Sequence, residues 1–322
     1  MHAASVIMLC WAMIGAACFF SGSVPALVAV SLAVLVAFIG LPHGAADHRF
    51  ARSRLEPLLG SSWLAGFLVG YIAIALLVVL GWVWAPSFTI AAFFLASAWH
   101  FGQEEPRLPV GPQFLRPAFR FARGGLVIWA PLVFQQGEVF GLLSVVAPGG
   151  LGPESRAMLG VLANWSWLML ATAAAAWGLQ AMLAIGAGRW RRRVLLLDNA
   201  MVASLLVLFA LASPVVAFLV YFCGWHSARG LKRLRRELRE SWPQLALSLA
   251  PLTVSAIALT VVGVCWGLPG THWNETVIRA TFVGLSAVAV PHLLLHGLAP
   301  YLDTSGQRHS TRPAPSAVGS AA

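Results

Sequence analysis

The stretch RWRRRVLLLDNAMVASLLVLFALASPVVAFLVYFCGWHSARGLKRLRRELRE, residues 189–240, carries a long apolar run between two basic clusters. Lys and Arg concentrate on the cytoplasmic side of membrane helices, so a single span would place one cluster on the wrong side. Ser213-Pro214 interrupts the run, because proline removes a backbone donor. Two short helices, 194–212 and 214–231, joined by an external turn would keep both clusters on one side. One long helix is the competing interpretation.

The composition of the whole chain is that of an integral membrane protein. It is 59% hydrophobic and only 10% charged, with a mean hydropathy of +0.80, whereas soluble domains carry about 25% charged residues. The net charge of +10 arises from basic residues that flank apolar runs. This placement favours contact with anionic lipid and argues against nucleic acid as a partner.

The apolar runs predict an all-α, polytopic membrane helix bundle of about eight to ten transmembrane helices. Residues 1–302 form a single integral membrane domain, and the polar tail 303–322 is expected to be a disordered cytoplasmic segment. The four cysteines lie in apolar stretches without a CxxC pair and are read as core residues. The runs cover residues 4–20, 24–41, 63–84, 88–101, 124–147, 160–186, 194–222, 243–267 and 277–298.

Charge distribution gives the bundle an orientation. With ten helices and both termini inside, every Lys and Arg except Arg156 and Arg279 falls on the cytoplasmic side or in the tail. The cytoplasmic loops are then those around 44–62, 102–123, 187–193 and 232–242.

Histidines stand near the predicted inner ends of several helices. His43, His100 and His226 share this depth with His292, and His296 follows His292 at the i, i+4 spacing of one helix face. Polar groups at membrane depth are costly and usually functional. Neutral imidazoles suit iron, copper or zinc, so these residues are candidate metal ligands. His2, His272 and His309 lie elsewhere and are poor candidates.

Each candidate also has a simpler interpretation. A single helix-end histidine more often bonds a carbonyl or water than a metal, although agreement in depth favours a site for the group. Asp47 and His48 would orient ligand imidazoles by hydrogen bonds, or they would cap a helix. Gln103 and Glu104, just after His100, have the same two readings.

Aromatic side chains surround the candidate ligands. They form either an interfacial aromatic belt or the lining of a slot for a long apolar substrate. The belt is favoured for Trp99, and the lining for Tyr221 and Phe222. The full set is Trp99, Phe101, Tyr221, Phe222 and Trp225.

Four segments together resemble the Brp/Blh family of membrane β-carotene 15,15′-dioxygenases. They are PHGAADH (42–48), SAWHFGQE (97–104), YFCGWHSARG (221–230) and VPHLLLHG (290–297). The resemblance implies a multi-pass iron enzyme of the bacterial inner membrane that cleaves the central double bond of β-carotene with dioxygen to give two retinals. It also implies that His43, His100 and His226 are ligands of Fe²⁺.

Position 230 departs from this family. The family's third segment has a second histidine one helical turn after the first, and this chain has Gly230 there. His292 or His296 could complete the metal shell, water could take the vacant position, or the activity could be lost or changed. If the lost ligand matters, Gly230→His should raise iron affinity.

Three rival functions fit parts of the sequence. The chain could be a transporter whose buried histidines relay protons, since broken helices are common in that class. It could be a di-iron desaturase or hydroxylase, although adjacent His-His pairs are absent from the sequence. A catalytically inactive member that binds carotenoid is the third.

Overall fold

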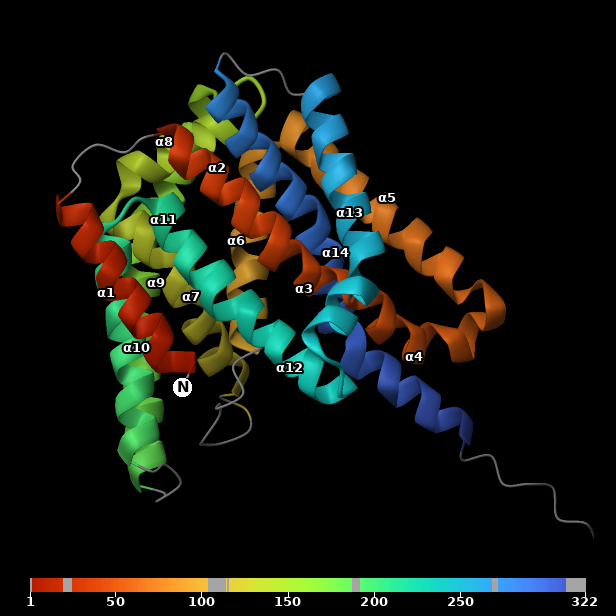
Figure 1. Ribbon diagram of the computed structural model, residues 1–322. Helices are drawn as coiled ribbons and strands as arrows, with labels where there is room; N and C mark the ends of the chain where they lie inside the picture. Colours follow the sequence, from red (N-terminus) through yellow and green to blue (C-terminus); the bar gives the residue numbers. More distant parts are fainter. Residues whose placement is uncertain are drawn as a thin grey trace, which may run out of the picture.

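The computed structural model describes residues 2–19, 25–103, 114, 116–186, 192–267 and 272–310, and all regular structure within these ranges is helical (Figure 1). The predicted all-α helix bundle is therefore confirmed.

The first part of the chain forms helices on both sides of a sharp turn. Helix α1 spans His2–Phe19, and α2 (Pro25–Leu35) continues without a break into a π-helix, η1 (Val36–Gly40), and then α3 (Leu41–Ala45). Helix α4 (Asp47–Leu59) ends at Gly60, whose positive φ of 56° favours glycine. Helix α5 (Trp63–Trp84) follows this turn after a short 3₁₀ segment, η2 (Gly60–Ser62).

The next four helices form a compact group. They are α6 (Pro86–Gln103), α7 (Arg116–Phe134), α8 (Gln136–Val146) and α9 (Pro153–Gly186). The predicted run over 124–147 is not one straight helix, because α7 and α8 are bent by 103° at the break between them, Gln135. The Gln135 amide donates to the carbonyls of Phe209 (2.6 Å) and Ala212 (2.5 Å), so this break joins the end of another helix and satisfies its carbonyls.

The stretch from 192 onward confirms the predicted break at Ser213-Pro214. Helix α10 (Arg192–Leu211) ends there, and α11 (Pro214–Leu219) begins with Pro214 at its first position. A second π-helix, η4 (Val220–Ser227), leads directly into the basic helix α12 (Ala228–Leu238).

Two long helices complete the bundle. They are α13 (Trp242–Gly267) and α14 (Trp273–Ser310). Helix α14 continues past 302 into the segment predicted to be disordered, and 311–322 lie outside the described residues.

Several helices can cross a membrane. Four helical stretches are long and apolar enough to do so, and the bent α7–α8 pair makes a fifth if it is counted as one span. One of these stretches, Ala26–Trp84, turns at Gly60 and thus holds more than one segment. The shorter apolar helices Ala3–Ala16 and Asn199–Leu211 fall below this length, so the count of eight to ten stays a prediction.

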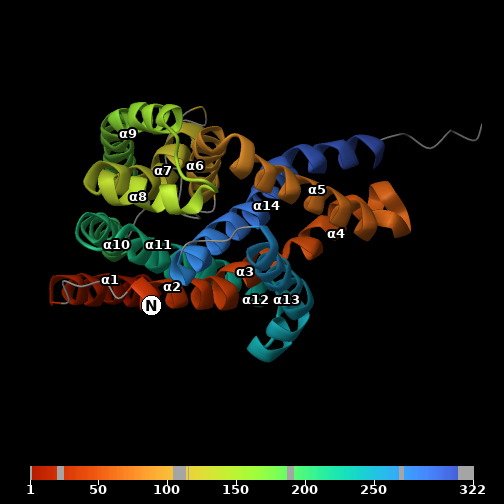
Figure 2. The same ribbon diagram turned by 90° about the horizontal axis from the view of Figure 1, so that it is seen from above.

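Helix α14 lies centrally in the bundle. Figure 2 shows α6 to α9 gathered on one side, α1 to α3 on the other, and α14 passing between them. Helices α6 and α7 cross so closely that a Cβ on Gly124 would lie 1.9 Å from the carbonyl oxygen of Ala98. This contact fixes the end of α6 that carries His100.

Candidate metal centre

Four imidazoles from different parts of the chain converge in the bundle. His43 comes from α3, His100 from the last turn of α6, His226 from η4 and His292 from the middle of α14. His100, His226 and His292 are buried, with 3% to 6% of their surface exposed, and His43 is half-buried. The predicted convergence of these residues is thus present in the structure.

The imidazoles of these four residues contact one another in a closed cycle. We call this set of four residues, His43, His226, His100 and His292, the histidine ring. Going round it, the ring centres are 5.2 Å apart for His43 and His226, and 5.3 Å for His226 and His100. They are 4.9 Å apart for His100 and His292, and 5.3 Å for His292 and His43. Neighbouring rings meet edge to face rather than in stacks.

The spacing of neighbouring rings is close to that of imidazoles that share one metal ion. An imidazole bound to a divalent ion at about 2.0–2.1 Å has its centre roughly 3 Å from the ion, so rings sharing one ion lie roughly 4.5–5.5 Å apart. The Nε2 atoms of His43, His100 and His292 are buried, and that of His292 has no hydrogen-bond partner among the described residues. A buried, unsatisfied nitrogen is costly unless something binds it. The donor set is therefore suited to a transition metal.

Asp47 supports the histidine ring from outside. Its buried carboxylate accepts a 2.7 Å bond from His292 Nδ1 and a longer one of 3.3 Å from His296 Nε2. The Tyr71 hydroxyl lies 3.4 Å from the same carboxylate and donates to the carbonyl of Val288 at 2.7 Å. A proton held on Nδ1 of His292 leaves the lone pair on its Nε2.

Asp47, His292 and His296 themselves bring ligand atoms within 4.8 Å of one another. In this trio the 2.7 Å bond already occupies one Asp47 oxygen and His292 Nδ1, so we take it as the second candidate for a metal, after the histidine ring. His296 faces Asp47 and stacks on Phe50 at 4.3 Å. The ring centre of His296 is 4.5 Å from that of His292 and 6.3 Å from that of His100, so His296 borders the histidine ring on their side.

Other predicted polar residues lie apart from the ring. His48 bonds the carbonyl of Ala45 at 2.8 Å, a local contact that matches the cap reading. His272 is outside the helices at the start of α14. Glu104 lies outside the described residues. Gln103 forms no hydrogen bond with the four histidines within the described part of the chain.

Gly230 lies directly against the histidine ring. A Cβ built on it would be 2.2 Å from Cε1 and 2.4 Å from Nδ1 of His43. Real Cβ atoms do not come this close, so the imidazole of His43 fills the space that a side chain at position 230 would need. In this chain the His43 imidazole therefore takes up the space beside position 230.

Most of the predicted aromatic lining meets His226. The ring centre of Phe101 is 4.8 Å from that of His226, edge to face, and the ring of Phe222 stacks on His226 with 5.7 Å between the centres. The ring centre of Tyr221 is 6.4 Å from that of His226. Trp225, the residue just before His226, is buried. Trp99 is 38% exposed, as expected of a residue in an interfacial aromatic belt. These contacts exclude water from one side of the ring.

A family model described as beta-carotene 15,15'-dioxygenase matches residues 34–299. The chain belongs to this family. The match spans all four histidine segments, and the resemblance seen in the sequence is confirmed. No solved structure matches the chain.

Two curated relatives carry the same description. A beta-carotene 15,15'-dioxygenase from an uncultured marine bacterium, 66A03, is 28% identical over 86% of this chain and 94% of its own length. The probable beta-carotene 15,15'-dioxygenase Blh of Halobacterium salinarum is 30% identical over 84% of this chain and 86% of its own.

The dioxygenase-family chain also has two features that its sequence did not predict. The π-helices η1 and η4 lie next to the candidate ligands: His43 follows η1, and His226 is within η4. π-helical turns are often found at functional sites. Apolar residues predominate in both segments, so their hydrophobic pattern gives no signal of the wider helix. The closeness of Gly230 to His43 was also not predicted.

Proposed function

We propose that this chain is an iron-dependent membrane dioxygenase that cleaves the central 15,15′ double bond of β-carotene, or of a related carotenoid, to give retinal. The observation that carries the proposal is the buried ring of His43, His100, His226 and His292 in a chain of this family. The names of both relatives support the reaction.

The histidine ring would hold one Fe²⁺ through its imidazole nitrogens. Bound there, iron would supply the redox chemistry by which dioxygen attacks a polyene. In the overall reaction, the central carbon–carbon double bond breaks and each carbon receives one oxygen atom, so one dioxygen is consumed for two aldehydes. A cofactor that carries the difficult chemistry leaves the protein to bind, orient and exclude water.

The chain's own residues have distinct parts in this function. Asp47 keeps the Nδ1 proton of His292 in place, which turns Nε2 toward the ring. It also brings a negative charge close to a site that would hold a dication. Phe101 and Phe222 cover His226 with apolar surface, as contact with a polyene requires.

The proposal is tested by expressing the chain in a bacterium that accumulates β-carotene. We expect the pigment to bleach and retinal to appear, with about one iron per purified chain. His226→Ala should abolish both the bleaching and the iron, while His272→Ala, outside the ring, should retain them. Colour that persists with folded, iron-loaded protein would refute the cleavage of β-carotene.

The same experiment separates the rival functions. Pigment that copurifies uncleaved would identify a carotenoid binder. Two irons per chain would indicate a di-iron enzyme, and a protein without metal would fit a transporter.

A further inference from the structure

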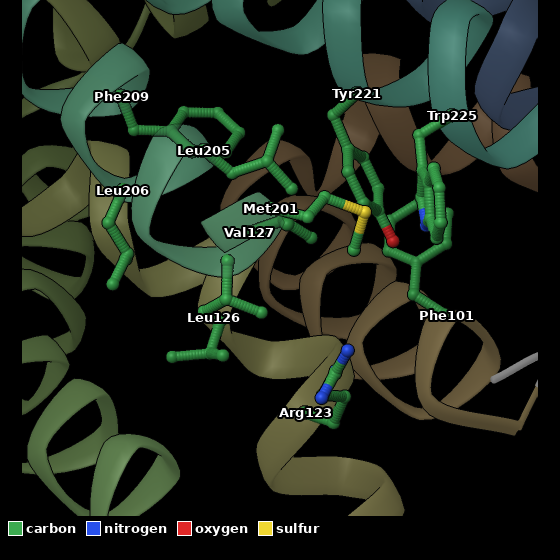
Figure 3. Close-up of a pocket in the computed structure, with 11 residues that line it drawn as sticks. Phe101, Arg123, Leu126, Val127, Met201, Leu205, Leu206, Phe209, Tyr221 and Trp225 are labelled. Carbon is green, nitrogen blue, oxygen red and sulfur yellow. The ribbon is translucent and has the colours of Figure 1, made fainter. Parts of the chain in front are cut away.

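The histidine ring has different surroundings at two opposite corners. Next to His226, the aromatic residues Phe101 and Tyr221 line a cavity of about 30 Å³ (Figure 3). One water molecule needs about 10–15 Å³, so this cavity has room for about two small molecules. His292, across the ring from His226, instead meets the buried carboxylate of Asp47 at 2.7 Å. Polar contacts therefore help to set the position of His292.

Helix α14 is weakened immediately beside His292. Pro291 has no backbone N–H, so it cannot donate to the carbonyl of Ala287 four residues earlier, and its ring crowds that carbonyl. A proline in the interior of a helix loosens or bends the helix at this point. The direction in which the imidazole of His292 projects then depends on the contacts that this turn makes with other helices.

Tyr71 on α5 contacts this turn of α14. Its hydroxyl donates to the carbonyl of Val288, one turn before His292, at 2.7 Å. The same hydroxyl lies 3.4 Å from one carboxylate oxygen of Asp47, and the other carboxylate oxygen accepts the bond from His292. Tyr71 thus touches both supports of His292, which are the backbone of its turn and the carboxylate that holds its Nδ1.

The hydroxyl of Tyr71 stands out in an apolar helix. Apart from three tryptophans, Tyr71 is the one residue of α5 whose side chain carries a polar group, and α5 belongs to a helical stretch apolar enough to cross a membrane. A hydroxyl in such a place is costly unless it is hydrogen-bonded, and polar groups at membrane depth usually serve a function. The ring of Phe67, one turn earlier, lies 5.4 Å from that of Tyr71 between centres and adds apolar cover.

We propose that Tyr71 is a positioning residue for the metal site: it fixes the turn of α14 beside Pro291 and so sets the direction of Nε2 of His292. The inference rests on one part of the proposed function, that the histidine ring holds a metal ion. Without the hydroxyl, the backbone at Val288 loses its bond to α5. The imidazole of His292 then meets the metal in a less favourable direction, and the metal binds more weakly.

The test uses Co²⁺ as the probe, because Co²⁺ binds imidazole nitrogens and its visible absorption spectrum depends on the arrangement of its ligands. Tyr71→Phe removes only the hydroxyl. We expect it to weaken Co²⁺ binding by about tenfold, as for other residues that orient metal-bound histidines, and to shift the absorption bands of the bound ion. Competition with a chelator measures the affinity, on the purified full-length chain in detergent.

Ser286→Ala is the matched control. The hydroxyl of Ser286 accepts a 2.8 Å bond from Nε1 of Trp82, so this variant also breaks a hydrogen bond between α5 and α14. It should unfold at about the same temperature as Tyr71→Phe, which shows that both variants are folded. It should nevertheless bind Co²⁺ as the wild type does, with an unchanged spectrum.

Two results would overturn the inference: wild-type affinity and spectrum of Co²⁺ in Tyr71→Phe, or an equal loss of Co²⁺ binding in Tyr71→Phe and Ser286→Ala. The second result would show that Tyr71 only joins the two helices. If β-carotene is not cleaved in cells while Co²⁺ binding depends on Tyr71, the proposed reaction fails and the role of Tyr71 stands. If cleavage occurs and Tyr71→Phe binds Co²⁺ like the wild type, the reaction stands and the role fails.

Discussion

At the scale of single residues, the imidazole of His43 occupies the space that a side chain at position 230 would need. Because a Cβ at 230 would lie 2.2 Å from the His43 ring, Gly230→His cannot simply add a ligand. We expect Gly230→His and Gly230→Ala both to push His43 out of the histidine ring and to lower the iron content to less than about half that of the wild type. Metal analysis of the purified protein measures this.

Gly44→Ala is the matched control for this substitution. Gly44 is next to His43 on α3, and a Cβ there meets nothing within 4 Å, so iron content should be unchanged. The sequence alone pointed to higher iron affinity for Gly230→His. If Gly230→His does raise iron content, His43 must have room to move and the crowding argument is wrong.

Asp47 gives a second prediction at this scale. Asp47→Asn preserves the shape but removes the charge that holds the Nδ1 proton of His292. We expect iron affinity to fall by about 10- to 100-fold, as for other residues that orient metal-bound histidines. Competition with a chelator measures the affinity. Glu56→Gln, which removes an exposed carboxylate from the same helix, is the control, and equal affinities of the two variants would exclude this role of Asp47.

At the scale of elements, the crossing of α6 and α7 holds His100 in place. A Cβ on Gly124 would meet the backbone of Ala98 at 1.9 Å, and backbone cannot turn away as a side chain can. Gly124→Ala should therefore destabilise the fold by about 3 kcal/mol or more and reduce iron content. Gly137→Ala on α8, whose Cβ meets nothing within 4 Å, should not. Equal thermal unfolding of the two variants in detergent would contradict this account of the crossing.

The breaks and bends of the helices show which parts of the fold the sequence could predict. Ser213-Pro214 predicted the break between α10 and α11 because proline acts locally on its own helix. The bend at Gln135 was missed, since it depends on carbonyls of another helix at Phe209 and Ala212. The π-helix that carries His226 was missed for the same reason: its register is set by packing rather than by local residue preference.

The candidate site, too, could be predicted from the sequence only in part. That His43, His100, His226 and His292 come together could be predicted, because a common depth follows from hydropathy and basic flanks. His292 nevertheless lies in the middle of α14 and not at a helix end.

The sequence favoured His292 as the fourth ligand with His296 as the alternative, but the spacing alone could not separate them, because both share one face of α14. The structure separates them through Asp47, which lies far away in the sequence. Its carboxylate bonds Nδ1 of His292 and leaves Nε2 on the side of the ring, whereas it bonds Nε2 of His296.

At the scale of the whole molecule, basic helices gather at one end. Figure 1 shows α4 and α12 at the same end of the bundle, opposite the end at which α14 begins. Arg49 on α4 pairs with Glu240, just after α12, at 2.9 Å. Both helices adjoin the histidine ring, since Asp47 begins α4 and Gly230 is on α12. From the positive-inside tendency we predict that the histidine ring lies on the cytoplasmic side, where intracellular iron could reach it.

This orientation predicts which surface cysteines react in intact cells. Ser61→Cys lies in the exposed turn after α4, and Gly152→Cys lies in the exposed turn before α9, near the other end. A maleimide that cannot cross the inner membrane should label Gly152→Cys in cells whose outer membrane is permeable to it. It should label Ser61→Cys only after the inner membrane is opened, and wild-type protein gives the background of the native cysteines. Labelling of Ser61→Cys in intact cells would reverse the topology and place the basic end outside, against the charge distribution on which the cytoplasmic assignment of the histidine ring depends.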